Sequence, residues 1–141
     1  MAPLVSTIEI ARPPDEVFAY ATDPSRFAEW QHDVVRVRLL DGSRFTTIRR
    51  IRGAERTMSQ QITQNEAPHN WAARGIDGTI RPHATITVEP IEDGTRSRVT
   101  FTLDFEGHGL GVPLVPLVRR QARHAAPTSY QNLKRLLERG H

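Results

Sequence analysis

The chain has 141 residues, a formal net charge of +3, 38% hydrophobic and 25% charged residues, which is typical of one globular domain (residues 1–141) and not of a disordered segment. The absence of cysteine excludes a disulfide framework, thiol catalysis and thiolate metal sites, and is compatible with a reducing compartment. No charged segment followed by a long apolar run opens the sequence and no stretch approaches the roughly 20 apolar residues that span a bilayer, so we expect a cytoplasmic protein without membrane insertion.

The first elements are one strand and two short helices. Residues 5–10 alternate in the manner of a strand. Pro13 and Pro14 end it, and proline followed by two acidic residues suits the first turn of a helix. Asp23 and Pro24 predict the N-cap and first turn of a second short helix over residues 25–30.

From residue 34 onward, hydrophobic and polar residues tend to alternate, which is the repeat of two residues that a β-strand shows. Turn residues such as Asp41-Gly42, Asp77-Gly78 and Asp93-Gly94 divide this stretch into segments. Short turns between successive segments predict an antiparallel meander. The candidate strands are 34–40, 44–52, 56–64, 71–77, 82–91 and 97–106.

The last segment has the period of a helix. One apolar stripe runs through residues 113–139, and Pro127 should kink or interrupt this helix near residues 123–126. The stripe is the one segment large enough to cover the concave face of the sheet. A strongly twisted sheet around a single helix does not close along its whole length, so we expect a cavity between them.

Arginine dominates the basic residues, since Lys134 is the single lysine among 19 basic side chains. Two short clusters occur: Arg49, Arg50 and Arg52, and Arg119, Arg120 and Arg123. We interpret them as solvated faces of a strand and a helix and not as a nucleic-acid footprint, and we expect no nucleic-acid partner.

Three stretches carry a family resemblance: the opening STIEIARPPDEVFAYATDPSRFAEW, the hairpin VEPIEDGTRSRVTFTLDFE and the ending YQNLKRLLE. With the order of elements, they resemble the SRPBCC or START-related superfamily, and within it the polyketide cyclase/dehydrase-like branch. The resemblance implies an α+β helix-grip fold, as in START and birch-pollen-allergen proteins. A seven-stranded curved antiparallel sheet would wrap around the long C-terminal helix, with two short helices after the first strand. It also implies a pocket, because members bind hydrophobic ligands; some cyclise polyketides and others carry lipids.

Strand alternation predicts which side chains face this pocket. Arg49, Gln60 and Tyr130 would orient carbonyl or phenol oxygens of a ligand. The apolar walls would come from Trp30, Phe45, Trp71, Ile86, Phe101, Phe105 and Leu117. Each of these residues has an alternative role that does not involve a ligand. The aromatic rings could simply fill the core, and the Tyr130 hydroxyl could bond a backbone carbonyl. Arg49 could lie on the outer face of the sheet and pair with a carboxylate.

The sequence offers little for metal or nucleophilic chemistry. None of the six histidines has a zinc-type spacing, and no serine stands in a G-x-S-x-G turn. The run from Gly107 to Gly111 lacks the spacing of a nucleotide loop and is interpreted as a flexible connector. We expect surface histidines, no metal and no cofactor.

Three functions stay open at this point. The first is a binder or carrier of a small hydrophobic or aromatic molecule, either lipid-like or polyketide-like. The second is a cyclase/dehydrase-type enzyme in which Arg49 stabilises an enolate oxygen and Tyr130 moves a proton. The third is a protein-interaction module. We expect a monomer or homodimer with a small hydrophobic ligand as its partner.

Overall fold

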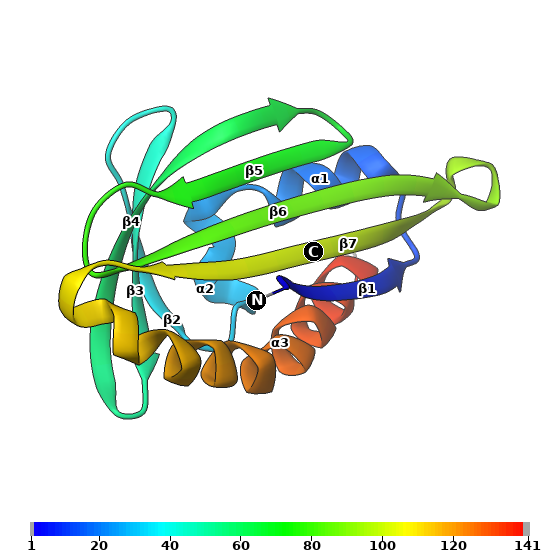
Figure 1. Cartoon of the computed structure of the whole chain (residues 1–141). Helices are drawn as coiled ribbons and strands as arrows, with labels where there is room; N and C mark the ends of the chain where they lie inside the picture. Colours follow the sequence, from blue (N-terminus) through cyan, green and yellow to red (C-terminus); the bar gives the residue numbers. More distant parts are fainter. Residues whose placement is uncertain (1, 140–141) are drawn as a thin grey trace.

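The computed structural model describes residues 2–139 and contains one seven-stranded antiparallel sheet (Figure 1). The strand order is β1-β7-β6-β5-β4-β3-β2, so β2 to β7 form a meander and β1 pairs with the last strand. This confirms the predicted curved antiparallel sheet of seven strands. The strands are β1 (Leu4–Ile10), β2 (Val34–Leu39), β3 (Arg44–Ile51), β4 (Ala54–Glu66), β5 (Asn70–Gly75), β6 (Ile80–Ile91) and β7 (Arg96–Gly107).

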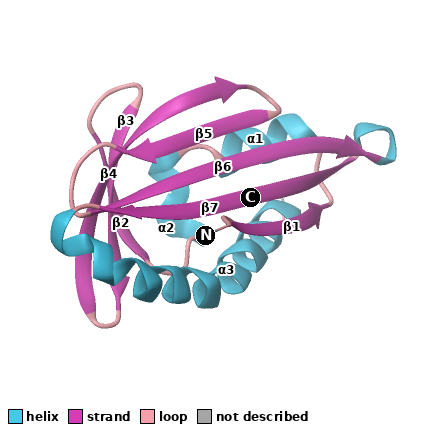
Figure 2. Ribbon diagram, viewed as in Figure 1, coloured by secondary structure: helices cyan, strands magenta, loops and turns pink. Residues whose placement is uncertain are grey.

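The sheet is strongly curved. Figure 2 shows β2, β3 and β4 running steeply across the ends of β5, β6 and β7. Register shifts between Val34 and Arg36 on β2 and between Ile62 and Gln64 on β4 mark the irregular positions in this half of the sheet. Such bulges bend a strand and increase its twist, which allows the sheet to wrap around a helix.

The two predicted short helices are present after β1. Helix α1 (Pro14–Ala21) has its proline in the first turn, followed by Asp15 and Glu16. Helix α2 (Phe27–Trp30) is preceded by a 3-10 turn, Pro24–Arg26, whose backbone N–H at Ser25 donates to the Asp23 carboxylate at 3.0 Å. The capping prediction is therefore confirmed, although the α-helical part starts later than expected.

The long helix α3 covers Val115–Glu138 and follows a 3-10 segment, Gly109–Leu114. The prediction that Pro127 interrupts this helix was wrong, because the helix continues through that residue. Pro127 lies on the exposed side, so the Arg123 carbonyl that loses its intrahelical partner also faces solvent. In Figure 1 the second half of α3 turns away from the direction of the first, as a proline-bent helix does.

The core consists of two hydrophobic clusters. The larger cluster joins α1, α2 and the second half of α3 to the sheet and includes Trp30, Trp71, Phe101 and Leu133. The smaller cluster lies near the start of α3 and contains Ile51, Met58, Ile80 and Val118. The first half of α3 therefore rests on a separate patch of apolar side chains.

Polar contacts fix both ends of α3. Near its start, Arg119 is 6% exposed, forms a salt bridge with Asp104 on β7, and donates to the Ala2 carbonyl at 2.7 Å. Near its end, the Glu138 carboxylate accepts from the Ala11 backbone N–H at 2.8 Å. The prediction that the Arg119 cluster is a solvated helix face was wrong for Arg119 itself, because the hydrogen-bonded salt bridge lets its guanidinium be buried.

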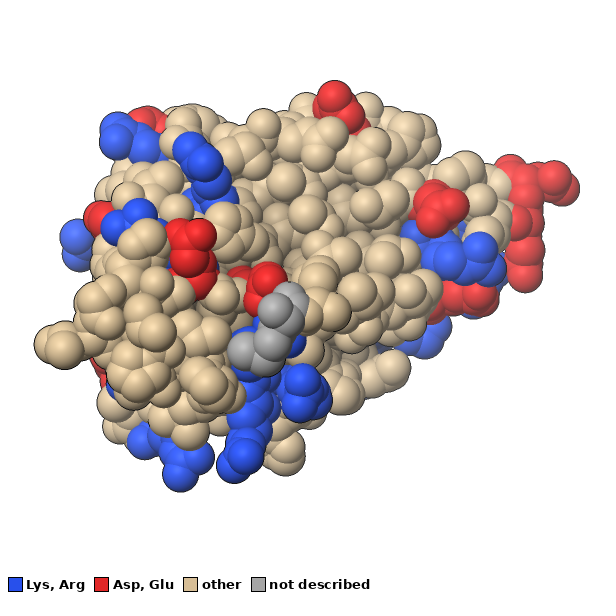
Figure 3. All heavy atoms as spheres, viewed as in Figure 1, with Lys and Arg blue, Asp and Glu red and all other residues tan. Residues whose placement is uncertain are grey.

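The neighbouring residues Arg120 and Arg123 are exposed, as predicted. In Figure 3, Lys and Arg side chains protrude along the edge of the molecule where α3 runs.

Candidate functional site

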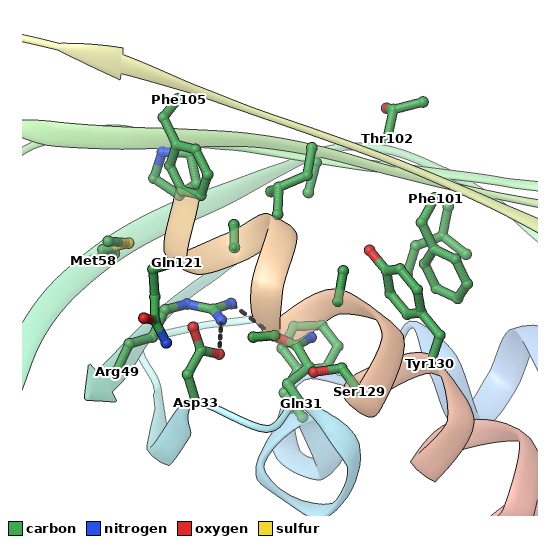
Figure 4. Close-up of a pocket in the computed structure, with 18 of the residues that line it drawn as sticks. Gln31, Asp33, Arg49, Met58, Phe101, Thr102, Phe105, Gln121, Ser129 and Tyr130 are labelled. Carbon is green, nitrogen blue, oxygen red and sulfur yellow. Dashed lines mark hydrogen bonds and ion pairs between the residues drawn. The ribbon is translucent and has the colours of Figure 1, made fainter. Parts of the chain in front are cut away.

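A cavity lies between the sheet and α3, with residues of both hydrophobic clusters in its wall (Figure 4). Its free volume is about 90 Å³. A buried water needs about 10–15 Å³ of such space, so the cavity has room for a group of roughly six to nine water-sized atoms. Cavities on the order of 150 Å³ bind a benzene molecule, so this space is on the scale of a small organic molecule.

Small side chains on α3 leave this space open. Ala122, Ala125, Ala126 and Ser129 all line the cavity, and three of them are alanine. Successive residues three or four positions apart lie on the same face of a helix, so this run presents one shallow face toward the sheet. The helix therefore covers the cavity without entering it.

Aromatic rings form much of the wall opposite and beside this face. The Tyr130 ring stacks on Phe101, with centroids 3.9 Å apart and an interplanar angle of 11°. The Trp30 ring lies 6.0 Å from Phe101 and 6.4 Å from Tyr130, and Phe27 meets both Trp30 and Trp71 edge to face. Offset and edge-to-face contacts of this kind hold rings in fixed orientations, so the wall is rigid.

The charged side chains in the wall form one neutral pair. Arg49 Nη1 donates to Asp33 Oδ1 at 2.8 Å, and Arg49 Nη2 donates to Gln31 Oε1 at 2.7 Å. The Arg49 and Asp33 side chains are 19% and 11% exposed. Figure 4 shows the three residues together along one side of the cavity, with Arg49 coming from β3. The guanidinium keeps further N–H donors beyond the two that these bonds use.

Other polar groups of the wall are bonded within the protein. Gln60 is 4% exposed, and its amide nitrogen lies 3.4 Å from Thr47 Oγ1, the acceptor. Ser129 Oγ accepts from the His32 backbone N–H at 2.7 Å. This second bond ties α3 to the loop between α2 and β2.

The Tyr130 hydroxyl points toward the interior of the cavity (Figure 4). Burial raises the pKa of Tyr130 to about 12, while the positive charge of Arg49 opposes the shift and Asp33 adds to it. At neutral pH the group is therefore a phenol that can donate a hydrogen bond, and it is not a base.

The structure brings together most of the predicted site residues. Arg49, Gln60 and Tyr130 all line the cavity. Arg49 was predicted either to face the cavity or to pair with a carboxylate on the outer face of the sheet. The structure shows part of each, because its side chain faces inward and pairs there with Asp33. Of the predicted apolar residues, the cavity is lined by Trp30, Trp71, Ile86, Phe101 and Phe105.

Phe45 and Leu117 are not in the cavity wall, contrary to prediction. Phe45 is 1% exposed, but its ring packs 5.6 Å from that of Phe27 within the larger cluster and does not line the cavity. Leu117 is half-buried, and the adjacent Val118 lines the cavity instead. The short turn that precedes α3 determines which side of the helix faces the sheet. The apolar stripe in the sequence did not show whether Leu117 or Val118 would point into the cavity.

Sequence reasoning missed several wall residues: Phe27, Gln31, Asp33, Gln121, Ala126 and Ser129. The first three come from the short helix α2 and the loop after it, which have no periodicity to indicate a face. The small residues of α3 did give a signal, because alanines within the stripe of a core-facing helix leave space.

Within residues 2–139, no three side chains of His, Asp or Glu approach closely enough to hold a metal ion. The described part of the chain also contains no helix long and apolar enough to cross a membrane. Of the six histidines predicted at the surface, His141 lies outside the described residues.

The comparisons with known proteins agree with this architecture. The model of the family "polyketide cyclase / dehydrase and lipid transport" matches residues 1–138. Comparison with curated protein sequences found no match.

Solved structures of the same fold come from several bacteria. The Zhui aromatase/cyclase from Streptomyces sp. R1128 superposes with a TM-score of 0.82 at 14% identity, over 97% of this chain and 93% of that one. A START superfamily protein from Mycobacterium smegmatis gives 0.79 at 15% identity, over 99% of both chains. A protein from Thermus thermophilus gives 0.79 at 18% identity, also over 99% of both. The superpositions show the fold, and the family match shows that the chain belongs to the polyketide cyclase/dehydrase and lipid transport family.

Proposed function

We propose that the protein binds a small hydrophobic or aromatic molecule in the cavity beneath α3. The observation that carries the proposal is the space itself: about 90 Å³ left open by the small side chains of α3 and bounded by aromatic rings. Native interiors are packed to the density of organic crystals, so a space of this size between the sheet and the helix is unusual and supports a binding role. Membership of a family named for cyclases and lipid transport supports the same interpretation.

Affinity should be modest. Burying about 300 Å² of ligand surface at about 25 cal/mol per Å² gives roughly 7 kcal/mol before the costs of association. Without those costs, about 7 kcal/mol corresponds to a dissociation constant of roughly 10 μM, and each 1.4 kcal/mol of cost weakens binding about tenfold, so we expect binding weaker than micromolar.

The test uses toluene as a single-ring probe and follows the fluorescence of the two tryptophans, Trp30 and Trp71, which both line the cavity. Ala125→Leu places a larger side chain into the space and should weaken toluene binding at least tenfold. The matched control is Ala19→Leu, which adds the same atoms on the exposed side of α1. Toluene that does not bind, or that binds equally to the Ala125→Leu variant, would reject the proposal.

A cyclase-type reaction is the second candidate, and the shared wall position of Arg49 and Tyr130 favours it. In an aldol-type ring closure of a poly-β-keto chain, a water molecule would take the proton of the attacking carbon and Arg49 would stabilise the enolate oxygen that results. The Tyr130 phenol would donate its proton to the oxygen of the carbonyl that is attacked, and the protonated water would return the proton to Tyr130. The cavity would hold the reacting carbons close to each other.

Turnover of an aromatic polyketide precursor by the purified protein tests this candidate. Arg49→Ala and Tyr130→Phe should each reduce the rate about 100-fold. Absence of turnover, or turnover that survives Arg49→Ala unchanged, argues for binding without catalysis.

A further inference from the structure

Four side chains form a polar corner in the otherwise mostly apolar cavity wall: Gln31, Asp33, Arg49 and Gln121 (Figure 4). Arg49 bonds both Asp33 and Gln31, and Figure 4 shows Gln121 of α3 reaching the same side of the cavity. The two charges of the cavity wall, those of Arg49 and Asp33, both lie in this corner. The hydrogen-bonding capacity that they leave unused therefore decides which polar group of a ligand fits there.

Asp33 has an acceptor oxygen that the protein does not use. Its Oδ1 accepts from Arg49 Nη1 at 2.8 Å, whereas its Oδ2 has no hydrogen-bond partner among residues 2–139. In this part of the chain, the polar side-chain atoms that are both fully buried and unpaired are Nε1 of Trp30, Nε1 of Trp71 and Nε of Arg56. Asp33 Oδ2 is not one of them, so it is accessible, and a ligand in the cavity can reach it.

Donors lie next to this oxygen. The Arg49 guanidinium keeps further N–H groups beyond the two that bond Asp33 and Gln31. A carboxylate oxygen can only accept a hydrogen bond, and a guanidinium can only donate one. The polar corner therefore offers a ligand one negatively charged acceptor and positively charged donors side by side.

The neutral polar groups of the wall do not discriminate in this way. An amide has a donor and an acceptor, and a hydroxyl group can rotate to serve as either. This applies to the amides of Gln31, Gln60 and Gln121, to the hydroxyls of Ser129 and Tyr130, and to those of Thr85 and Thr102, which bond each other. These groups adapt to a donor or an acceptor on the ligand, so the choice between the two is made by Asp33 and Arg49.

A hydroxyl group on the ligand matches the polar corner. It can donate its proton to Asp33 Oδ2 and accept from Arg49 with its oxygen. A carbonyl group can only accept, so it would bond Arg49 and gain nothing from Asp33. A carboxylate would be repelled by Asp33, and an ammonium group would be repelled by Arg49.

We propose that Asp33 accepts a hydrogen bond from a hydroxyl group of the ligand, and that the ligand is an uncharged phenol or small aromatic alcohol. This inference rests on the proposed binding function and names the class of ligand for the same cavity. The hydroxyl lies in the polar corner, and the ring packs against the aromatic wall that includes Phe101 and Tyr130. The negative charge of the acceptor makes this hydrogen bond stronger than one between neutral groups.

Phenol and toluene are the test pair, because they have nearly the same shape and differ by OH in place of CH₃. Phenol has a pKa of about 10, like a tyrosine side chain, so it is neutral at pH 6. Isothermal titration calorimetry at pH 6 measures both dissociation constants. Both compounds should bind, and phenol should bind more tightly although it gives up more hydration than toluene.

Asp33→Asn keeps the size of the side chain and removes the charge of the acceptor. In this variant the ratio of the toluene to the phenol dissociation constant should fall at least about tenfold, as expected when a hydrogen bond to a charged group is lost. The matched control is Asp15→Asn, which removes the same charge from the exposed first turn of α1. The control should leave the ratio unchanged.

A crystal of the unmutated protein soaked in 4-bromophenol gives a readout that does not depend on how the variants fold. The anomalous signal of bromine locates one end of the molecule, and the hydroxyl group is at the other end. The hydroxyl oxygen should lie within hydrogen-bond distance of Asp33 Oδ2, with the bromine on the far side of the ring.

The outcomes separate this inference from the binding function. If toluene binds and phenol does not, if Asp33→Asn leaves the ratio unchanged, or if the bromine occupies the polar corner, the inference is wrong and the binding function stands. If neither phenol nor toluene binds, the binding function fails and the inference fails with it.

Discussion

The Tyr130 ring stacks on the Phe101 ring, 3.9 Å between centroids, and so joins the second half of α3 to strand β7. The stack lies at one end of the cavity, and Met58 and Phe105 lie toward the other (Figure 4). It holds the helix over the sheet at a fixed height and also directs the Tyr130 hydroxyl into the open space. One contact therefore serves both the fold and the site.

The two roles of this contact can be separated. Phe101→Ala removes a buried ring and should lower the free energy of unfolding by about 3–5 kcal/mol. Tyr130→Phe keeps the stack and should change the free energy of unfolding by less than about 1 kcal/mol, because the hydroxyl has no hydrogen bond within residues 2–139. Urea denaturation measures both values. Equal losses for the two variants would contradict this division.

The tyrosines predict how stability changes at alkaline pH. The chain has two, and burial is the largest cause of a raised pKa for both Tyr20 and Tyr130, to about 12 for Tyr130. A raised pKa means that the folded state favours the neutral phenol. Its contribution to stability is complete below pH 10, the ordinary pKa, and is lost as pH rises from 10 toward 12.

Absorbance at 295 nm, which follows tyrosinate, checks this expectation. The folded protein should show no tyrosinate transition centred at pH 10, whereas the protein in 8 M urea should titrate there. A folded protein in which one tyrosine titrates at pH 10 would show that the corresponding ring is accessible to water.

The order of strands and helices could be predicted from the sequence because period-two alternation is clear wherever one face of a strand is buried. On β3 the alternation also placed Phe45, Arg49 and Ile51 on the inner face. Alternation gives the face of a residue but not its depth along the strand. For this reason Phe45 was predicted in the cavity wall, although it packs within the larger cluster and does not line the cavity.

The partners of the inward-facing residues could not be predicted. Asp33 and Gln31, which bind Arg49, belong to the loop between α2 and β2, where no periodic pattern applies. Arg119 was predicted at the surface because it belongs to a short cluster of arginines that was interpreted as the solvated face of a helix. Its burial depends on Asp104 and the Ala2 carbonyl, which come from two distant parts of the chain.

The Arg119–Asp104 pair fixes the start of α3, and its loss should be measurable. Arg119→Met keeps most of the aliphatic length but leaves Asp104, whose side chain is 35% exposed, without its cation. Because water partly reaches that carboxylate, we expect a loss of about 1–3 kcal/mol in the free energy of unfolding. Arg120→Met on the exposed side is the control and should change stability by less than about 0.5 kcal/mol. Similar values for the two variants would show that the pair does not anchor the helix.

The neutral pair in the cavity wall predicts a change of ligand selectivity. In Asp33→Asn, Arg49 loses its counter-charge, so benzoate should bind about tenfold more tightly than to the unmutated protein, while acetophenone changes little. Asp41→Asn, on the exposed β2–β3 turn, is the control and should alter neither affinity. Titration of both compounds gives the comparison. Benzoate affinity that stays constant in Asp33→Asn would show that Arg49 does not face the ligand.

The most direct measurement is a crystal of the protein soaked in bromobenzene, with anomalous diffraction collected to locate the bromine atom. We predict one strong anomalous peak between the alanines of α3 and the rings of Trp30 and Phe101, with no large shift of the helix. A cavity without bromine, alongside peaks confined to the molecular surface, would contradict the claim that this space receives a small aromatic molecule.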